Sequence, residues 1–527
     1  MAWRGLLLVA IVAVLAVPFA MRQSSAIAQN DDVVVILSPH NEAIRHEIGR
    51  GFVRWYRERT GRSIRVDWRI VGGTADISRF LESAYSNAFE REWSVRGHRA
   101  WSGAVQTRFQ SANADNDSDE AVRTARAAFL HSHVSSGVDL FFGGDTYQYS
   151  KEAAAGRLVD AGLLTLHPDW FTDGVIPREF GGEPFWDAQG RWYGVVVSGY
   201  GILSNRDALA RQHIATAPKQ WADLTDFAFA GAVGLADPTK SGSVCEAFEN
   251  MIQQQINRRV GSVPVEAAVR DGWLAGLRLI QVMGANARYF TDSSQKPPID
   301  VASGDCAAGL CIDFYGRQQQ EATSRRGDSN RLEFHVPAGG TAMSADPVGL
   351  LRGAPHRTAA VAFMEYVLSL DGQKIWGLRP GSPGGPEIYA LRRIPIRRDF
   401  YQHSEWTRFR SDPDDNPYSE ATRLVYQPEW TGDLFREIGV ITRVMCQDTH
   451  AELVNAWRAI HEAPEPRRTS ALAALQALDV VTYERAKTDI HRRLSSRDGV
   501  EQVRLASELG NYFRKQYAEA ERIARGD

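Results

Sequence analysis

The pattern of apolar and polar positions in the first part of the chain changes its period from one segment to the next. Residues 33–37 (VVVIL) form a continuous apolar run, as a strand buried on both faces of a sheet requires. Apolar residues then recur at helical spacing through 44–55, and residues 64–70 alternate between apolar and polar as a half-buried strand does. This succession of strand, helix and strand predicts an α/β fold, in which ligands bind where strands lead into loops and helices.

The same type of patterning continues along most of the chain. Further strands are predicted at 138–142, 193–198, 200–204, 233–236, 308–314 and 348–352, and a helix at 358–370. The polar, acidic stretch 111–120 (SANADNDSDE) is typical of a mobile surface loop or an insertion. A run of Gly, Ser and Pro at 381–386 marks a break. From residue 449 onward the strand signals fade, and apolar stripes predict helices.

The first thirty residues have the character of an export signal. Arg4 supplies positive charge, Gly5 to Ala20 is an apolar run, and the small residues around Ala28 fit cleavage before Gln29. We therefore predict a signal peptide over residues 1–28, with an uncleaved N-terminal anchor as the alternative. Either form places the protein in the periplasm or another extracytoplasmic space.

Composition narrows the class of protein further. The chain has 527 residues, and 61 Lys and Arg against 64 Asp and Glu give a net charge of −3, without the basic excess of a nucleic-acid binder. A hydrophobic fraction of 43% supports substantial cores, and the length suggests about three or four domains. The 4 Cys exclude a disulfide scaffold. Cys306 and Cys311 either pair with each other or serve as small buried apolar residues.

Several short motifs occur in the order found in bacterial extracellular solute-binding proteins of ABC importers. They are Ser38–Ala43 (SPHNEA) after the first strand, Val138–Gly144 (VDLFFGG), Asp237–Ser243 (DPTKSGS), Gly304–Gly309 (GDCAAG) followed by Asp313–Tyr315 (DFY), and Asp371–Lys374 (DGQK). Over roughly residues 33–395 the chain resembles this family, and in particular its ferric-ion-binding branch.

The resemblance implies a particular arrangement of the α/β fold. Two lobes would be joined by crossing strands, would bind the ligand in the cleft between them, and would close on it by a hinge. One lobe is then expected over residues 31–199 together with 336–395, and the other over 200–335. Residues 396–527 would form a mostly helical C-terminal extension, which the resemblance does not cover.

The resemblance also implies ligand-binding roles for His40 and Tyr315. His40 lies in the loop after the first strand, where the family has a metal-binding His, and Tyr315 falls on the second position of its Tyr-Tyr pair. Imidazole and phenolate groups can both bind a metal ion. The first Tyr of the pair is replaced here by Phe314, which has no oxygen to donate. The expected ligand is therefore either Fe(III), held by His40 and Tyr315, or a small anionic compound such as a phosphorylated one.

Other candidate ligand-binding residues lie in loops that precede helices. Ser241, Gly242 and Ser243 would place backbone N–H groups and hydroxyls at a helix start, where anions bind, although N-capping by Ser explains them as well. Asp145 and Thr146 directly follow the VDLFF strand, and an Asp N-cap is the alternative there. The remaining candidates are Tyr200 beside the hinge, Ser294, and Asp313.

The predicted function is that of a non-catalytic, periplasmic solute-binding component of an ABC transporter. It would capture a small ligand and deliver it to a permease in the inner membrane. The second hypothesis is an exported enzyme on the same fold, although neither GxSxG nor GxxxxGK[ST] occurs in the chain. The third is a sensory or scaffolding protein whose C-terminal helices bind a partner.

Overall fold

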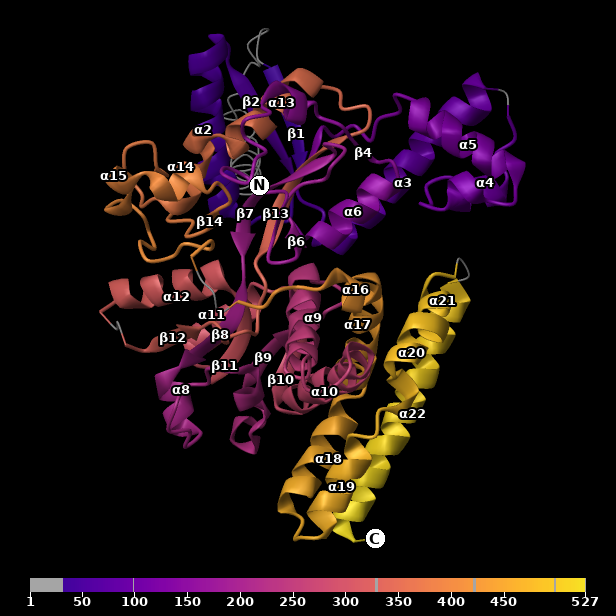
Figure 1. Cartoon of the computed structure of the whole chain (residues 1–527), viewed down its shortest axis with the longest axis vertical. Coiled ribbons are helices and arrows are strands. Elements are labelled where there is room, and N and C mark those ends of the chain that lie inside the picture. Colours follow the sequence, from indigo (N-terminus) through magenta and orange to yellow (C-terminus); the bar gives the residue numbers. More distant parts are fainter. Residues whose placement is uncertain (1–31, 98, 328–329, 420–422, 497–498, 527) are drawn as a thin grey trace, which may run out of the picture.

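The chain folds into two lobes, each built on its own β-sheet (Figure 1). The computed structural model describes residues 32–97, 99–327, 330–419, 423–496 and 499–526. The predicted signal peptide or anchor, residues 1–28, lies outside these ranges. Helices cover both sheets, and the predicted two-lobe α/β fold with a helical C-terminal region is confirmed.

The first lobe contains a seven-stranded sheet with the order β14-β7-β13-β3-β1-β2, and β4 pairs with β13. β1 runs parallel to β2 and β3, whereas β13 runs antiparallel to β3 and β7. Val34 and Ile36 of β1 are fully buried, which explains the continuous apolar run of that strand. The strands are β1 (Asp32–Leu37), β2 (Ile64–Arg69), β3 (Leu140–Phe142), β4 (Leu158–Val159), β7 (Trp192–Ser198), β13 (Ser344–Leu351) and β14 (Ile394–Pro395), with a separate hairpin of β5 (Glu179–Phe180) and β6 (Glu183–Pro184).

Helices pack on both faces of this sheet. They are α2 (Glu42–Thr60), α3 (Thr74–Glu90), α6 (Thr146–Ala154), α7 (Leu163–Leu166), α13 (Arg357–Leu368) and α14 (Leu370–Gly377), with η1 (Arg91–Arg96), α4 (Gly103–Arg108), η2 (Ala114–Asn116) and α5 (Glu120–His131) forming a helical group at one side (Figure 1). The stretch 111–120, predicted as a mobile loop or an insertion, has regular structure. It contains η2 with the buried Ala114, and Asp119 caps α5.

The second lobe contains a five-stranded sheet with the order β10-β9-β11-β8-β12. The strand predicted at 308–314 ends at Ile312, because Asp313 and Phe314 already form the first turn of a helix. The elements are β8 (Tyr200–Asn205), β9 (Val233–Ala236), β10 (Ala287–Thr291), β11 (Ala308–Ile312), β12 (Leu332–His335), α8 (Arg206–Arg211), η3 (Trp221–Thr225), η4 (Phe227–Phe229), α9 (Gly242–Asn257), α10 (Val265–Ala285), α11 (Lys296–Ser303) and α12 (Asp313–Arg325).

The chain passes between the lobes three times. It leaves the first sheet at Gly199, between β7 and β8, and returns through residues 336–343, between β12 and β13. A third crossing follows Tyr418, where the backbone N–H of Leu424 donates to Thr341 (3.2 Å) and that of Tyr426 donates to Gly181 (2.8 Å). The lobe boundaries expected from the sequence stay a prediction, but the crossings locate the hinge.

The C-terminal region divides its packing between the two lobes. Ile396 belongs to the core of the first lobe, and Tyr401 and Tyr418 pack against it. Helices after the third crossing share one continuous core with the second lobe. The elements are η5 (Asp399–Gln402), α15 (Ser404–Thr407), α16 (Pro428–Thr431), η6 (Gly432–Leu434), α17 (Phe435–Thr442), η7 (Arg443–Gln447), α18 (His450–Glu462), α19 (Arg467–Leu475), η8 (Asp479–Val481), α20 (Tyr483–Arg485), η9 (Ala486–Ile490), α21 (His491–Leu494) and α22 (Gly499–Arg525).

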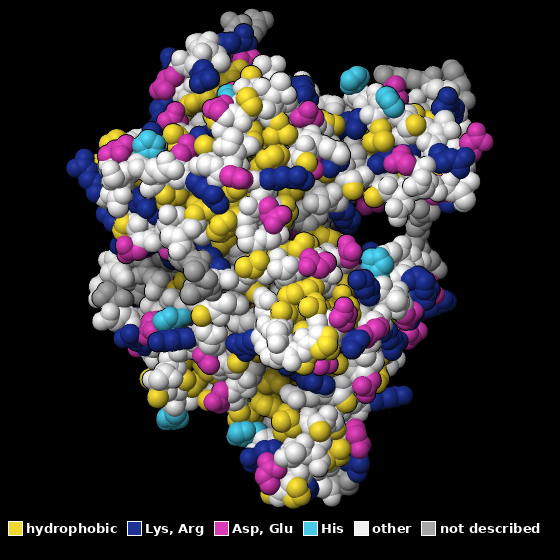
Figure 2. Space-filling model, in the orientation of Figure 1, with side chains coloured by type: hydrophobic (Ala, Val, Ile, Leu, Met, Phe, Trp, Pro, Cys, Tyr) yellow, Lys and Arg dark blue, Asp and Glu magenta, His cyan; other side chains and the backbone are white. Residues whose placement is uncertain are grey.

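The cysteines are buried in the core, and the surface carries charges of both signs. Cys306 and Cys311 are free and buried in one small apolar cluster, so the suggested pairing is wrong and they act as small apolar core residues. Within the described ranges, no helix has the length and apolar character needed to span a membrane. Lys and Arg are interspersed with Asp and Glu over the face shown in Figure 2, as the near-zero net charge suggests.

Candidate functional site

The N-termini of several helices meet where the two lobes touch. From the first lobe come the starts of α2, α3 and α6, and from the second lobe the starts of α9 and α12. The first N–H groups of a helix have no intrahelical partner, and the helix dipole adds partial positive charge there. A group of such ends is therefore suited to an anion.

Asp346 of β13 connects the groups on the first-lobe side. Its carboxylate accepts hydrogen bonds from His40 Nε2 (3.1 Å), from the backbone N–H of Gly144 (2.9 Å) and from Arg393 Nη2 (2.6 Å). Burial acts to raise the pKa of Asp346, but Arg393 and His40 outweigh it and hold the pKa well below its usual range. The carboxylate therefore stays ionised and fixes the orientation of both neighbouring side chains.

Arg393 is a site residue that the sequence analysis missed. Its side chain is buried, and its guanidinium lies 4.3 Å from the ring centroid of Phe314 and 5.8 Å from that of Trp376. Phe314 thus supplies an aromatic face for a cation, where the ferric-binding pattern would need an oxygen. In the described part of the chain, Arg393 Nε is buried without a hydrogen-bond partner. No motif marked this residue, because its role depends on contacts with distant segments.

Close backbone approach brings the helix starts of the first lobe together. Gly143 and Gly144 have φ values of 99° and 132°, which other residues rarely adopt. A Cβ atom on Gly143 would lie 2.6 Å from the His40 ring, and one on Gly144 would overlap the methyl group of Thr74. Asp145 then caps α6 by accepting from the N–H of Gln148 (2.8 Å). Burial raises the pKa of Asp145, which favours its neutral form.

The second lobe contacts these groups through the loop before α9. A Cβ atom on Gly242 would overlap the Asp145 carboxylate, and one on Gly73 would lie 2.9 Å from the carbonyl oxygen of Lys240. Ser241 caps α9 by accepting from the N–H of Val244 (3.4 Å). The N–H groups of Gly242 and Ser243 belong to the first turn of the helix. The lobes are therefore in contact at the site, as in a closed form.

Comparison with known proteins finds a family that the central part of the chain resembles. Residues 135–389 match the bacterial extracellular solute-binding proteins. These residues are similar to an extracellular solute-binding domain.

Two relatives match only part of the chain. The phosphoglycerate transport regulatory protein PgtC of Salmonella typhimurium is 27% identical over 284 residues, which are 54% of this chain and 60% of that protein. An uncharacterized protein of Haemophilus influenzae is 26% identical over 240 residues, or 45% of this chain and 60% of the relative. The chain thus spans about 60% of the length of each of these relatives.

Several solved structures are similar to the chain. The periplasmic binding protein AfuA from Actinobacillus pleuropneumoniae, with exogenous fructose-6-phosphate bound, has a TM-score of 0.48 at 16% identity, covering 81% of this chain and 97% of its own. Iron-bound HitA from Pseudomonas aeruginosa has a TM-score of 0.47 at 16% identity, covering 79% and 99%.

The predicted residues His40, Asp145, Gly242 and Tyr315 lie around this group of helix starts. Tyr315 is near Asn41, Arg393 and Asp346, and burial raises its pKa well above the usual value. Thr146 is the first residue of α6, and Ser241 and Ser243 flank Gly242.

Asp313 also belongs to these helix starts, whereas Tyr200 and Ser294 lie elsewhere. Asp313 is buried at the start of α12, where it accepts from the N–H of Phe314 (2.7 Å), and burial raises its pKa. Tyr200 faces the hinge, since its hydroxyl donates to Glu246 (2.7 Å) and its N–H donates to Thr341 (2.9 Å). Ser294 lies in the turn between β10 and α11, and the described contacts do not connect it to the helix starts.

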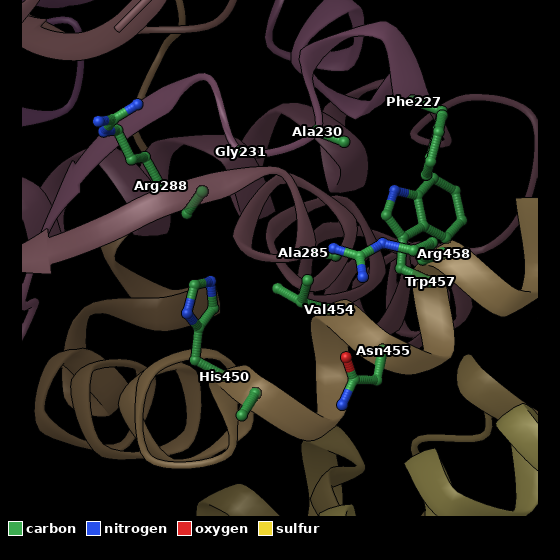
Figure 3. A pocket seen from close by; sticks show the side chains of 12 residues that line it. Phe227, Ala230, Gly231, Ala285, Arg288, His450, Val454, Asn455, Trp457 and Arg458 are labelled. Atoms are coloured by element: carbon green, nitrogen blue, oxygen red, sulfur yellow. The ribbon is translucent and has the colours of Figure 1, made fainter. Parts of the chain in front are cut away.

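A separate pocket lies between the domain and the C-terminal extension (Figure 3). Its volume is about 350 Å³, and β10 with the segment before β9 forms one wall while α18 forms the other. Its labelled polar side chains are Arg288, His450, Asn455, Trp457 and Arg458. None of the residues predicted for ligand binding lines it. The pocket is therefore distinct from the meeting point of the helix starts.

Proposed function

We propose that the protein is the extracytoplasmic solute-binding component of an ABC transporter and captures a small organic anion between its lobes. One observation carries the proposal: the N-termini of α2, α6 and α12 lie around the buried pair of Asp346 and Arg393, and those of α3 and α9 contact the start of α6. Backbone N–H groups can bind phosphate or carboxylate oxygens without burying a full counter-charge. Delivery of the ligand to an inner-membrane permease is part of the proposal.

An anion fits this site better than a ferric ion. His40 Nε2 already donates to Asp346, and Phe314 stacks on Arg393 in place of supplying a phenolate. A bound Fe(III) would also be close to the positive charge of Arg393, which lies near Tyr315. Within the described residues, no group of three or more His, Cys, Asp or Glu side chains is suited to holding a metal ion. The name of PgtC, a phosphoglycerate transport regulatory protein, supports a phosphorylated acid.

Calorimetric titration with anions and absorbance titration with Fe(III) citrate test the choice of ligand. We expect saturable binding of 3-phosphoglycerate, weaker binding of inorganic phosphate, and no tyrosinate-to-iron absorbance band on addition of Fe(III) citrate. An absorbance band that appears with the wild type and disappears in Tyr315→Phe would instead identify a ferric site.

A substitution at Gly242 tests the position of the site. A Val side chain there would overlap the Asp145 carboxylate of the opposite lobe, so Gly242→Val should prevent closure. Overlap of this kind costs about 1–3 kcal/mol, and we expect the Kd for 3-phosphoglycerate to rise roughly 10- to 100-fold. The melting temperature without ligand should change little, because the lobes can relieve the overlap by opening.

Gly103→Val is the matched control. Gly103 is also the first residue of a helix, and a Cβ atom there meets nothing within 4 Å. Equal affinities of wild type and Gly242→Val, with the control unchanged, would mean that the ligand does not bind at this contact between the lobes.

A further inference from the structure

The loop that carries Ser241 and Gly242 is held from behind by the C-terminal extension. Gln447 Nε2 of η7 donates to Asp237 Oδ2 (3.2 Å), and Arg443 Nη1 of the same element donates to Thr239 Oγ1 (3.2 Å). Asp237 is fully buried and also accepts from the N–H (2.8 Å) and the hydroxyl (2.6 Å) of Thr239. The side chains of the extension thus complete the hydrogen bonding of the turn from which α9 starts.

The backbone of α17 touches the same region. Cys245 Sγ of α9 donates to the carbonyl oxygen of Phe435 (3.1 Å). A Cβ atom on Gly439 would lie 3.4 Å from Cys245 Sγ and 3.5 Å from the carbonyl oxygen of Pro238. α17 therefore lies directly against both the loop and the first turn of α9.

The extension also reaches the first lobe beside the site. The ring of Phe435 stacks on that of Tyr147, with centroids 4.5 Å apart and planes at 24°. Tyr147 follows Asp145 and Thr146 in the first turn of α6. The start of α17 thus contacts one helix start from each lobe, while the side chains of Arg443 and Gln447 in η7 bond to the loop of the second lobe. The contacts made by η7 can therefore be tested separately from the stacking contact.

We propose that Arg443 and Gln447 are positioning residues of the ligand site, which hold the Asp237–Ser243 loop so that the N–H groups at the start of α9 face the ligand. The nature of the ligand rests on the function proposed above, whereas the positioning itself does not. η7 is a π-helix, and irregular turns of this kind frequently occur at functional sites. The extension is accordingly part of the binding machinery of the domain.

The physical reason is the short length of the loop and the burial of its anchor. Asp237 directly follows β9, and only three residues separate it from the N-cap Ser241. A buried carboxylate that loses a donor leaves an unsatisfied polar group, which favours rearrangement of the turn. Because Gly242 and Ser243 follow at once, such a rearrangement would move the N–H groups that are proposed to bind the anion.

The test uses the full chain with Arg443→Ala and Gln447→Ala combined. We expect faster amide hydrogen exchange confined to residues 237–245 and a rise of about tenfold in the Kd for 3-phosphoglycerate. The melting temperature should stay close to that of the control variant Arg514→Ala. Arg443→Lys, combined with wild-type Gln447, should recover most of the affinity because it keeps a donor. Arg514→Ala is the matched control, since Arg514 of α22 contacts Glu452 and Asp448 of the extension instead of the loop.

The outcomes separate this proposal from the proposed function. Unchanged exchange of residues 237–245 in the double variant would overturn the positioning role, and so would faster exchange throughout the second lobe with a lower melting temperature. If the wild type binds neither 3-phosphoglycerate nor phosphate, the proposed function fails. The local exchange result still decides the positioning role in that case, because it is measured without ligand.

Discussion

Replacing Phe513 by alanine is expected to destabilise the protein by about 3–5 kcal/mol, the cost of truncating a buried aromatic side chain. Phe513 lies on α22, close to the C-terminus, yet it is fully buried in the core that the extension shares with the second lobe. On the same helix, Tyr517 donates to the carbonyl oxygen of Met445 (2.8 Å) and accepts from Gln281 of α10 (3.2 Å). Loss of Phe513 would therefore loosen contacts that reach the solute-binding domain.

Chemical denaturation followed by circular dichroism measures this effect. Val503→Ala is the matched control, because Val503 lies on the same helix with 70% of its surface exposed. It should change the free energy of unfolding by no more than about 0.5 kcal/mol. Equal stabilities of the two variants would show that α22 does not contribute to the common core.

A chain that ends at Tyr418 should fail to fold its second lobe. The extension covers Trp273, Leu277 and Ile280 of α10, and the indole of Trp273 donates to the carbonyl oxygen of Val481 (2.8 Å). Exposing one such side chain costs about 1.5–3 kcal/mol, and a whole domain is stable by only about 5–15 kcal/mol. We expect aggregation and no cooperative melt. A monomeric, cooperatively melting product would contradict the common core.

The packing of the C-terminal extension shows what the pattern of apolar residues can and cannot predict. Apolar residues at 472, 475, 478, 503, 505, 509 and 513 predicted helices, which the structure has as α19 and α22. Leu478 lies after the end of α19, however, and Val503 is exposed on α22. An apolar stripe indicates that a helix buries one face, but it does not identify the partner. Here α22 packs mainly on α18 and α19, and Tyr517 also reaches Gln281 of α10. The core shared with the second lobe is therefore revealed only by the three-dimensional structure.

The candidate site shows the same limit on a smaller scale. Loops before helices directed attention to Asp145 and Gly242, because chemistry at a helix start can be inferred from local sequence. His40 was predicted from the family resemblance instead. Arg393 could not be found in this way, since its importance comes from Asp346 and Phe314, which lie in separate segments. Tyr200 was predicted as a ligand-binding residue beside the hinge, and there its hydroxyl donates to the buried carboxyl group of Glu246.

That carboxyl group belongs to a buried acidic cluster formed by Glu183, Glu246 and Glu249. Glu183 lies on β6 of the first lobe, and the other two lie on α9 of the second. Hydroxyl groups from the segments in and beside the three crossings between the lobes surround this cluster. Tyr200 and Ser344 lie beside Glu246, and Tyr426 (2.9 Å) and Thr431 (2.6 Å) donate to Glu249.

Burial is the main cause of the raised pKa values in this cluster, and the neighbouring carboxylates raise the pKa of Glu183 and Glu246 further. The pKa of Glu249 rises to about 7 and that of Glu246 to about 8, while the pKa of Glu183 is raised well above its usual value. Asp145 also faces Glu246, and Glu179 also faces Glu183. Hydroxyl groups act in the opposite direction on Glu246 and Glu249, but they do not cancel the effect of burial.

The protein should therefore lose stability as the pH rises from about 5 to about 8.5. Glu249 titrates near 4.5 in the unfolded chain and near 7 in the folded one, so the folded state holds a proton that the unfolded state has released. The stabilisation is complete below pH 4.5 and is lost as the pH passes through 7. For a shift of this size, the change is about 3 kcal/mol for this one group. Asp346, whose pKa is lowered instead, remains ionised throughout this range and does not contribute to the slope.

The substitution Glu249→Gln isolates the effect, because an amide cannot ionise and its oxygen can still accept from Tyr426 and Thr431. Urea unfolding at pH 5.5, 7 and 8.5 should show a smaller decrease in stability for this variant than for the wild type. Glu452→Gln, a change at a surface glutamate of α18, should leave the wild-type slope intact. If wild type and Glu249→Gln had parallel pH profiles, the carboxyl group of Glu249 would be ionised in the folded protein at neutral pH. A cation or water at the hinge would then have to compensate its charge.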